Sequence, residues 1–169
     1  MFEIGDYIIY GSNGVCKVDQ IGTMDANTFV SDRLFYTLIP VYRKESKVFT
    51  PVDNDKVIMR HIITKKEAME LIGDIDNIET IKESNDKKRE EVYRTIVRQC
   101  DCREWVRMIK TLYKNKNERL AGGKKVTAGE EKYLKIAEDS LFGELAIPLD
   151  IQKNKVDAYI RERANIEKY

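Results

Sequence analysis

Residues 64–72 read TKKEAMELI, and at this stretch the sequence changes from a strand pattern to a helix pattern. Thr64 and Glu67 have the spacing of a capping box, and the apolar residues that follow lie on one side of a short helix. Short β-rich runs precede the stretch, and helical periodicity follows it. The sequence therefore predicts an α+β protein in which a small sheet is followed by helices.

The first part of the chain contains several short strand signals. The densest run is residues 34–42, LFYTLIPVY, and shorter runs lie at residues 7–10, 15–21 and 47–52. Pro51 cannot donate a hydrogen bond to a neighbouring strand, so the last of these runs is expected at an edge or an end of the sheet. Four or five strands of this length predict a small barrel or a strongly bent sheet.

The remainder of the chain is typical of a helical bundle. Helices are predicted over residues 86–99, from Asp101 through an apolar stripe that contains Trp105, from Thr127 to about residue 145, and around residues 156–160. We expect three parts: a β-rich domain at residues 1–62, a short helix and acidic linker at residues 63–84, and a helical domain at residues 85–169.

Composition narrows the classes of function. The chain has 169 residues, of which 42% are hydrophobic, and it contains neither a long apolar run nor a signal pattern, so we expect a cytoplasmic protein with no membrane contact. Three cysteines (Cys16, Cys100 and Cys102) do not have zinc-ligand spacing, and His61 is the only histidine. These counts argue against a metal site and against histidine-dependent catalysis.

Glycine-rich segments do not add a catalytic motif. Residues 11–14, GSNG, lack the spacing of a phosphate-binding loop, and residues 122–125, GGKK, lack the strand that precedes such a loop. No nucleophile and base are suitably spaced either. We therefore expect a protein that is not an enzyme, with no cofactor and no small-molecule substrate.

Charge is distributed in blocks along the chain. The totals of 30 basic and 29 acidic residues nearly cancel, but residues 85–125 contain 13 basic and 6 acidic residues, a net charge of +7. Residues 87–89 (KKR) and 124–125 (KK) could lie along one phosphate backbone. An equally open interpretation is a solvated helix face with ion pairs such as Glu90 with Arg94.

Several motifs resemble one family along nearly the whole chain. The opening, residues 2–14, contains F-x-I-G-D-x-x-x-Y with a glycine following, and the helical half contains REEVY at residues 89–93, IKTLY at 109–113 and TAGEEKYL at 127–134. These motifs are similar to those of the CarD/CdnL family of bacterial transcription regulators. The helical half is most similar to clostridial-type members.

The resemblance implies a Tudor-like N-terminal domain that docks on the β subunit of RNA polymerase. Docking in the family pairs a strand edge of this domain with the polymerase. The matching edge in this sequence is Val48, Phe49 and Thr50, with Met24 on the adjacent turn. Family members often carry arginines at the positions of Met24 and Phe49, so backbone pairing is the part of the contact that carries over.

The resemblance also implies that the helical domain contacts promoter DNA near the upstream edge of the −10 element. The family's phosphate contacts carry over to Lys87, Lys88, Arg89 and Lys132, and Lys124 and Lys125 nearby complete the expected DNA-binding set of six basic residues. A tryptophan that enters the minor groove in the family is absent from residues 81–86, where Ile81 is the candidate replacement.

The implied function is a transcription regulator that alters the stability of the open promoter complex. The alternative is an adaptor that binds polymerase and makes no contact with DNA. The +7 block favours the regulator, and the missing tryptophan favours the adaptor.

Overall fold

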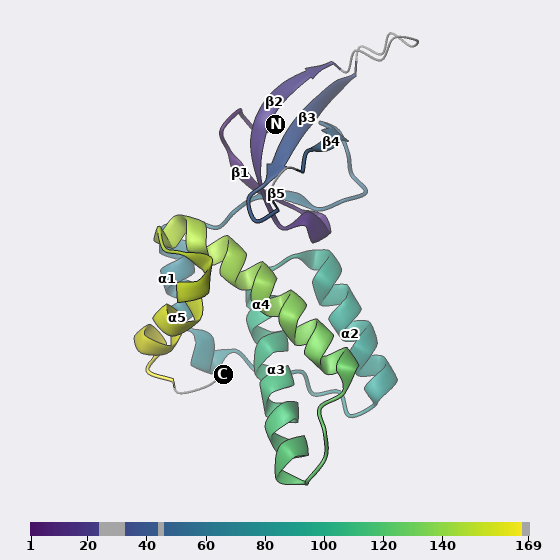
Figure 1. The fold of residues 1–169 in the computed structure, drawn as a ribbon, viewed down its shortest axis with the longest axis vertical. Helices are drawn as coiled ribbons and strands as arrows, with labels where there is room; N and C mark the ends of the chain where they lie inside the picture. The colour runs from purple at the N-terminus through teal and green to yellow at the C-terminus, as the bar shows by residue number, and fades with distance from the viewer. Residues whose placement is uncertain (24–32, 44–45, 167–169) are drawn as a thin grey trace. The chain divides into compact units, whose positions relative to one another are not determined.

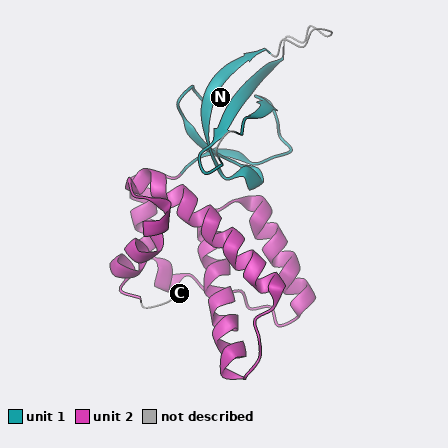
Figure 2. Cartoon of the chain, in the orientation of Figure 1, with its two compact units in different colours: residues 1–62 teal, residues 63–169 magenta. Residues whose placement is uncertain are grey.

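A computed structural model describes residues 1–23, 33–43 and 46–166 of the chain. The chain divides into two compact units, residues 1–62 and residues 63–169, coloured separately in Figure 2. The strands described in the structure lie in the first unit, and the α-helices lie in the second (Figure 1). An N-terminal sheet followed by helices confirms the predicted α+β class.

The first unit is built around one antiparallel sheet with the order β4-β3-β2-β1-β5. Its strands are β1 (Tyr7–Tyr10), β2 (Val15–Thr23), β3 (Leu34–Pro40), β4 (Val48–Pro51) and β5 (Met59–His61). Pro51 is the last residue of an edge strand, so the prediction from its missing N–H is confirmed.

Alternation of side chains along the strands separates a buried face of the sheet from an outer face. Ile8, Cys16, Val18, Tyr36 and Leu38 are buried together on the inner face. Because successive side chains of a strand point to opposite faces, residues between them in sequence, such as Lys17 and Thr37, point the other way. Hydrophobic burial on one face therefore fixes the register of the three central strands.

The turn between β1 and β2 requires glycine. Gly11 has a φ of +45°, and a Cβ at this position would lie 2.6 Å from Cγ1 of Val57. Both the backbone conformation and the available space exclude a larger side chain. The turn signal at residues 11–14 therefore corresponds to a local conformational requirement, and not to a phosphate-binding loop.

Over its described residues, 63–166, the second unit contains five α-helices. They are α1 (Lys65–Gly73), α2 (Asp86–Gln99), α3 (Cys102–Ala121), α4 (Ala128–Leu149) and α5 (Val156–Ala164). Side chains of Thr64, Asn85, Asp101 and Thr127 accept hydrogen bonds from backbone N–H groups and cap the first four helices. The start predicted for each of these four helices is confirmed to within a residue.

One face of α3 supplies much of the core of the helical unit. Trp105, Met108, Ile109 and Leu112 are at most 3% exposed. They pack with apolar residues of α2, α4 and α5 in one cluster. The apolar stripe that the sequence predicted from Asp101 onward forms this face, and Trp105 within it is a core residue.

The end of α4 lies beyond the predicted position. The helix continues to Leu149 instead of ending near residue 145, and Pro148 lies within its last turn. Leu145, Ala146 and Leu149 are buried in the core, so packing of this turn outweighs the hydrogen bond that proline cannot donate. The helix ends where Asp150 adopts a left-handed conformation.

Residues 73–84, predicted as a linker, pack against the helical unit instead. Ile75, Ile78 and Ile81 are buried in its core. Nζ of Lys110 on α3 donates hydrogen bonds to the carbonyl oxygens of Ile75 and Ile78 at 2.8 and 2.7 Å. The acidic residues of the segment suggested a solvated linker, but the regularly spaced isoleucines determine its packing.

Replacing Ile78 with alanine should destabilise the helical unit. The side chain is 4% exposed, and its loss leaves a cavity that costs about 2–5 kcal/mol of the free energy of unfolding. Chemical denaturation of the full chain, followed by far-UV circular dichroism, measures this change. Asp76→Ala, at an exposed position of the same segment, is the control and should leave the midpoint unchanged. Equal midpoints for the two variants would contradict the packing.

Candidate functional site

The edge strand β4 presents backbone hydrogen-bonding groups away from the sheet. Backbone N–H of Val52 donates to the carbonyl of Leu34 at 3.0 Å, which fixes the phase of the β4–β3 ladder. In an antiparallel pair, residues alternate between those bonded to the neighbouring strand and those whose N–H and C=O point outward. Phe49 pairs with Thr37 and belongs to the outward set.

Side chains of β4 alternate between exposed and buried positions along the strand. Phe49 is 51% exposed, whereas Thr50 is 1% exposed and its Oγ1 accepts a hydrogen bond from Nδ2 of Asn54 at 2.8 Å. Val48 is partly buried against the core of the sheet. Of the three predicted edge residues, Phe49 alone offers both an exposed side chain and outward backbone groups, while Val48 and Thr50 hold the strand on the sheet. The fourth predicted docking residue, Met24, lies outside the described residues.

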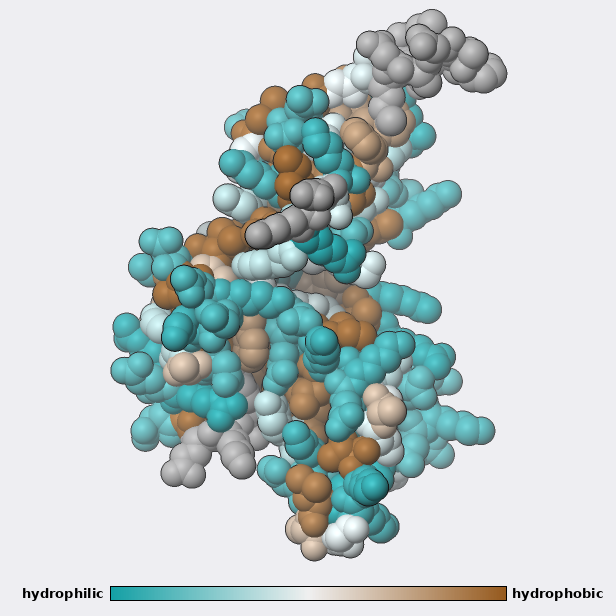
Figure 3. All heavy atoms as spheres, in the orientation of Figure 1, coloured by the Kyte–Doolittle hydropathy of each residue, from teal (hydrophilic) through white to brown (hydrophobic). Residues whose placement is uncertain are grey.

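The predicted cationic residues occupy two different environments. Lys87, Lys88, Lys124, Lys125 and Lys132 are exposed. On the face of the helical unit seen in Figure 3, hydrophilic residues dominate the surface, with hydrophobic residues between them. These five lysines are therefore available to a polyanion.

Arg89 is instead largely enclosed, with 14% of its side chain exposed. Its guanidinium pairs with Asp86 and donates to the carbonyl of Glu83 at 3.1 Å, and it lies 4.0 Å from Oε1 of Glu130. These partners hold the guanidinium against the protein. Arg89 is accordingly a residue that orders the start of α2, and its sequence-based assignment as a phosphate ligand stays a prediction.

The structure brings only some of the predicted cations together. Arg89 and Lys124 line one shallow depression with Arg119 and Glu130. Lys88 lies on another surface, a groove between α2 and α3 that also contains Val92 and Arg107. Arg89 thus lies beside Lys124, whereas Lys88 faces a different groove. The two lysine clusters do not line a single groove.

Sequence reasoning missed Arg119 and the role of Glu130. Nε of Arg119 lies 3.1 Å from Oε2 of Glu130, and both side chains are mostly buried. The capping-box spacing identified Glu130 as a cap for α4 but gave no indication of partners on other helices. Burial raises the pKa of the neighbouring Tyr93 above its ordinary value.

The candidate for a minor-groove wedge, Ile81, is not accessible, and neither is the tryptophan of the helical unit. Trp105 is 3% exposed and Ile81 is 8% exposed, and both belong to the core of the helical unit. The backbone N–H of Ile81 also donates to Oγ1 of Thr111 at 2.9 Å. The suggestion that Ile81 replaces a tryptophan wedge is therefore wrong, because its side chain is committed to the core.

The described residues contain neither a candidate metal site nor a candidate membrane span. Across residues 1–23, 33–43 and 46–166, no group of three or more His, Cys, Asp and Glu side chains is placed to hold a metal ion. Within the same ranges, no helix is both long enough and apolar enough to cross a bilayer.

Comparison with known proteins concerns the first unit. Residues 2–63 match the family model described as the CarD-like/TRCF RID domain. The N-terminal unit is similar to this CarD-like domain family over nearly all of its residues. The match confirms the resemblance of the chain to CarD-like proteins, and the similarity to clostridial-type members stays a prediction. A comparison of the chain with curated proteins found no match.

The family assignment applies to the sheet that carries the β4 edge. RID domains interact with the β subunit of RNA polymerase, and the family is in general not enzymatic. The CarD-like domain of this chain includes all five strands, so its exposed Phe49 edge lies within the matched residues. The helical unit lies beyond the match, apart from its first residue.

Loss of Arg89 should destabilise the helical unit more than loss of its exposed neighbour. Arg89→Ala removes the donor to the Glu83 carbonyl and one of the two cations beside Glu130, at a cost of about 1–3 kcal/mol. Lys87 is exposed and lies two residues before Arg89 on the same helix. Lys87→Ala is therefore the matched control and should leave stability unchanged. Thermal denaturation of both variants measures the difference. Equal melting temperatures would show that Arg89 is only a surface cation.

Proposed function

We propose that this chain is a transcription regulator that docks on the β subunit of RNA polymerase and contacts promoter DNA. Docking uses the β4 edge of the CarD-like domain. The helical unit touches DNA near the upstream edge of the −10 element and alters the stability of the open complex. Such a protein would be located with polymerase on the nucleoid. The observation that carries the proposal is an accessible strand edge inside a matched RID domain.

Docking through strand addition is supported by the geometry of β4. An edge strand with outward N–H and C=O groups can pair with a strand of another protein. Lateral pairing needs no particular side chain, so the replacement of the family's arginine by Phe49 is compatible with it. Phe49 contributes exposed apolar surface beside the paired strands.

Contact with DNA is supported by the charge and exposure of the helical unit. Residues 85–125 have a net charge of +7, and four of the six predicted phosphate ligands are exposed lysines in this block. Acidic neighbours such as Asp86 and Glu90 reduce the attraction, so affinity for free DNA should be modest. Attachment to polymerase compensates, because tethering raises the effective concentration of the helical unit at the promoter.

A polymerase-binding adaptor without DNA contact is the second candidate. It is favoured by the burial of Trp105 and Ile81, which leaves the region of the missing wedge without an insertable side chain. Footprinting of a polymerase–promoter complex with and without the protein separates the two candidates. Added protection at the upstream edge of the −10 element supports DNA contact, and an unchanged footprint with retained polymerase binding supports the adaptor.

Proline at position 49 should abolish binding to the polymerase β subunit. Phe49→Pro removes the outward N–H but leaves the inward ladder to β3 intact, because that ladder uses the alternate residues of β4. Binding of the full chain to the isolated β subunit is measured by biolayer interferometry. The control Phe49→Ala removes the side chain and keeps the donor, so it should retain most of the affinity. Unimpaired binding by a folded Phe49→Pro variant would exclude strand addition at this edge.

Charge reversal at the start of α2 should weaken DNA binding. Lys87→Glu with Lys88→Glu removes two cations from the proposed interface, so affinity for a promoter duplex should fall and its dependence on salt should become less steep by about 2. Fluorescence anisotropy at several salt concentrations measures both quantities.

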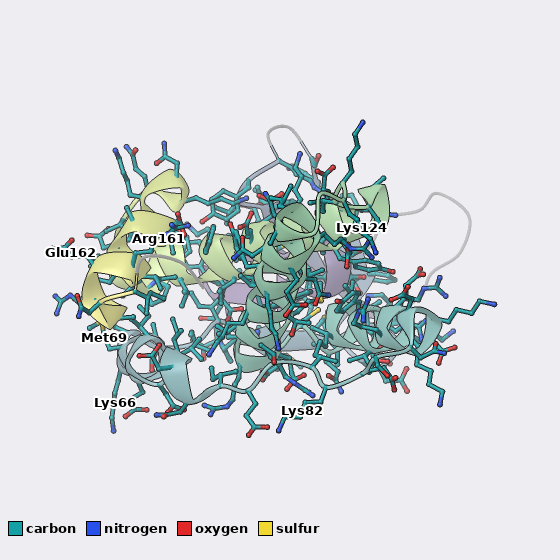
Figure 4. The ribbon with its side chains drawn as sticks, turned by 90° about the horizontal axis from the view of Figure 1, so that it is seen from below. Lys66, Met69, Lys82, Lys124, Arg161 and Glu162 are labelled. Carbon is teal, nitrogen blue, oxygen red and sulfur yellow. The ribbon has the colours of Figure 1, made fainter. Side chains whose placement is uncertain are left out.

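The matched control reverses two exposed lysines elsewhere on the helical unit. Lys65→Glu with Lys66→Glu makes the same change in net charge, and Figure 4 shows Lys66 far from Lys124. If both double variants lose the same affinity, binding depends on net charge alone, and the proposed interface is wrong.

The regulatory effect is tested by the lifetime of an open promoter complex at fixed salt, with and without the protein. A changed lifetime that Phe49→Pro abolishes supports regulation through the docked protein. An unchanged lifetime despite demonstrable binding to polymerase contradicts the regulator and favours the adaptor.

A further inference from the structure

Glu130 is an enclosed carboxylate at the meeting point of three helix ends. Its side chain is 11% exposed, and it lies in the first turn of α4. Partners come from the start of α2, the end of α3 and the cap of α4. Each of the two lysine clusters in the proposed DNA interface is adjacent in sequence to one of these ends.

We propose that Glu130 is a positioning residue for DNA contact, which holds the start of α2 and the loop before α4 in a fixed relative position. This inference rests on the proposed contact of the helical unit with DNA. Lys87 and Lys88 lie on the first turn of α2, and Lys124 and Lys125 lie on the loop between α3 and α4. Glu130 itself touches no phosphate in this arrangement.

Glu130 contacts Arg119 at the end of α3 and Arg89 at the start of α2. The contact with Arg119 is the shorter of the two. Oε2 of Glu130 lies 3.1 Å from Nε of Arg119 and 3.1 Å from Oγ1 of Thr127, while its backbone N–H donates to the same Oγ1 at 3.2 Å. Nδ2 of Asn115 approaches Oε1 at 3.4 Å. Partly buried charged pairs of this kind are stronger than exposed ones, because solvent screens them less.

The loop that carries the lysines lies between these anchored residues. Arg119 precedes it and Thr127 follows it, and the backbone N–H of Lys124 donates to the carbonyl of Arg119 at 2.8 Å. Fixing Arg119 against Glu130 therefore also restricts the position of Lys124. The ordering cost of the loop is met during folding, so it need not be met again on binding DNA.

The link to α2 passes through Arg89. Its Nη2 lies 4.0 Å from Oε1 of Glu130, and its Nη1 donates to the carbonyl of Glu83. Arg89 and Lys124 line the same depression, beside Glu130. One carboxylate thus restrains the residue next to Lys88 and the loop of Lys124 and Lys125 together.

Positioning and simple electrostatics predict opposite effects of neutralising Glu130. A carboxylate near a phosphate backbone repels it, so removing the charge should raise DNA affinity if charge is all that matters. If Glu130 holds the two clusters in place, removing the charge should lower DNA affinity, because fewer lysines then reach phosphates at the same time. The sign of the change distinguishes the two roles.

The test compares Glu130→Gln with Glu131→Gln in the full chain. Both residues lie in the first turn of α4, so the variants share the change in net charge and the loss of a favourable charge at a helix N-terminus. Glu131 is exposed and serves as the control. Affinity for a promoter duplex is measured by fluorescence anisotropy at several salt concentrations, after circular dichroism has confirmed folding.

We expect Glu130→Gln to bind DNA about fivefold more weakly than wild type. Its salt dependence should also become less steep by about 1, the change expected for one lost phosphate contact. Glu131→Gln should bind as tightly as wild type or more tightly. Binding by Glu130→Gln that equals or exceeds that of Glu131→Gln would overturn the inference.

Hydrogen exchange provides a readout that does not depend on DNA. The amides of Arg89 and Lys124 are hydrogen-bonded in the structure, and we expect both to exchange about fivefold faster in Glu130→Gln than in Glu131→Gln. Equal exchange would overturn the inference even if the wild-type protein binds no DNA. Absence of salt-dependent DNA binding by the wild type, with faster exchange in Glu130→Gln, would instead refute the proposed DNA contact alone.

A second variant covers the case in which Glu130→Gln fails to fold. Arg119→Gln breaks the same 3.1 Å pair from α3 and leaves Glu130 beside Arg89. The Lys124 amide should exchange faster in this variant, while the Arg89 amide should change less. Unchanged exchange at Lys124 would contradict the restraint of the loop through Arg119.

Discussion

The helical unit depends on the burial of one face of α3. Trp105, Ile109 and Leu112 on this face contact apolar residues of the surrounding helices, and burying them supplies the main free energy that offsets the ordering of the chain. Polar groups at the margins of the same helix then select which segments pack on it. Lys110 holds the isoleucine segment through backbone carbonyls, and Arg119 holds the start of α4 through Glu130.

The CarD-like domain is organised by a different constraint, the alternation of groups along its edge strand. Burial of Thr50 fixes which face of β4 points inward, and the ladder to β3 fixes which backbone groups remain available outside. Phe49 is exposed as a consequence of both. A docking edge of this kind depends on the phase of the strand more than on side-chain identity, which is compatible with a departure from the family's arginine.

The cations near the proposed DNA interface fall into two classes, enclosed arginines and exposed lysines. Arg89 and Arg119 are enclosed and paired with carboxylates, so they stabilise the junction of three helix ends. The lysines near them are exposed and have strongly hydrated ammonium groups on flexible stems, which suits weak and reversible contact with phosphates. The proposed function combines these classes, because enclosed pairs can order a surface whose exposed charges contact a polyanion.

Sequence alone determined the α+β class, the helix starts, the burial of Trp105 and the edge position of Pro51. Each of these follows from local rules: capping side chains, residue spacing along one helix, or a missing N–H. Only the tertiary structure decided that Ile78 and Ile81 belong to a core, that α4 continues past Pro148, and that Glu130 joins three helix ends. These outcomes depend on contacts between residues distant in sequence, and no local pattern specifies which buried surface or charged partner a segment will meet.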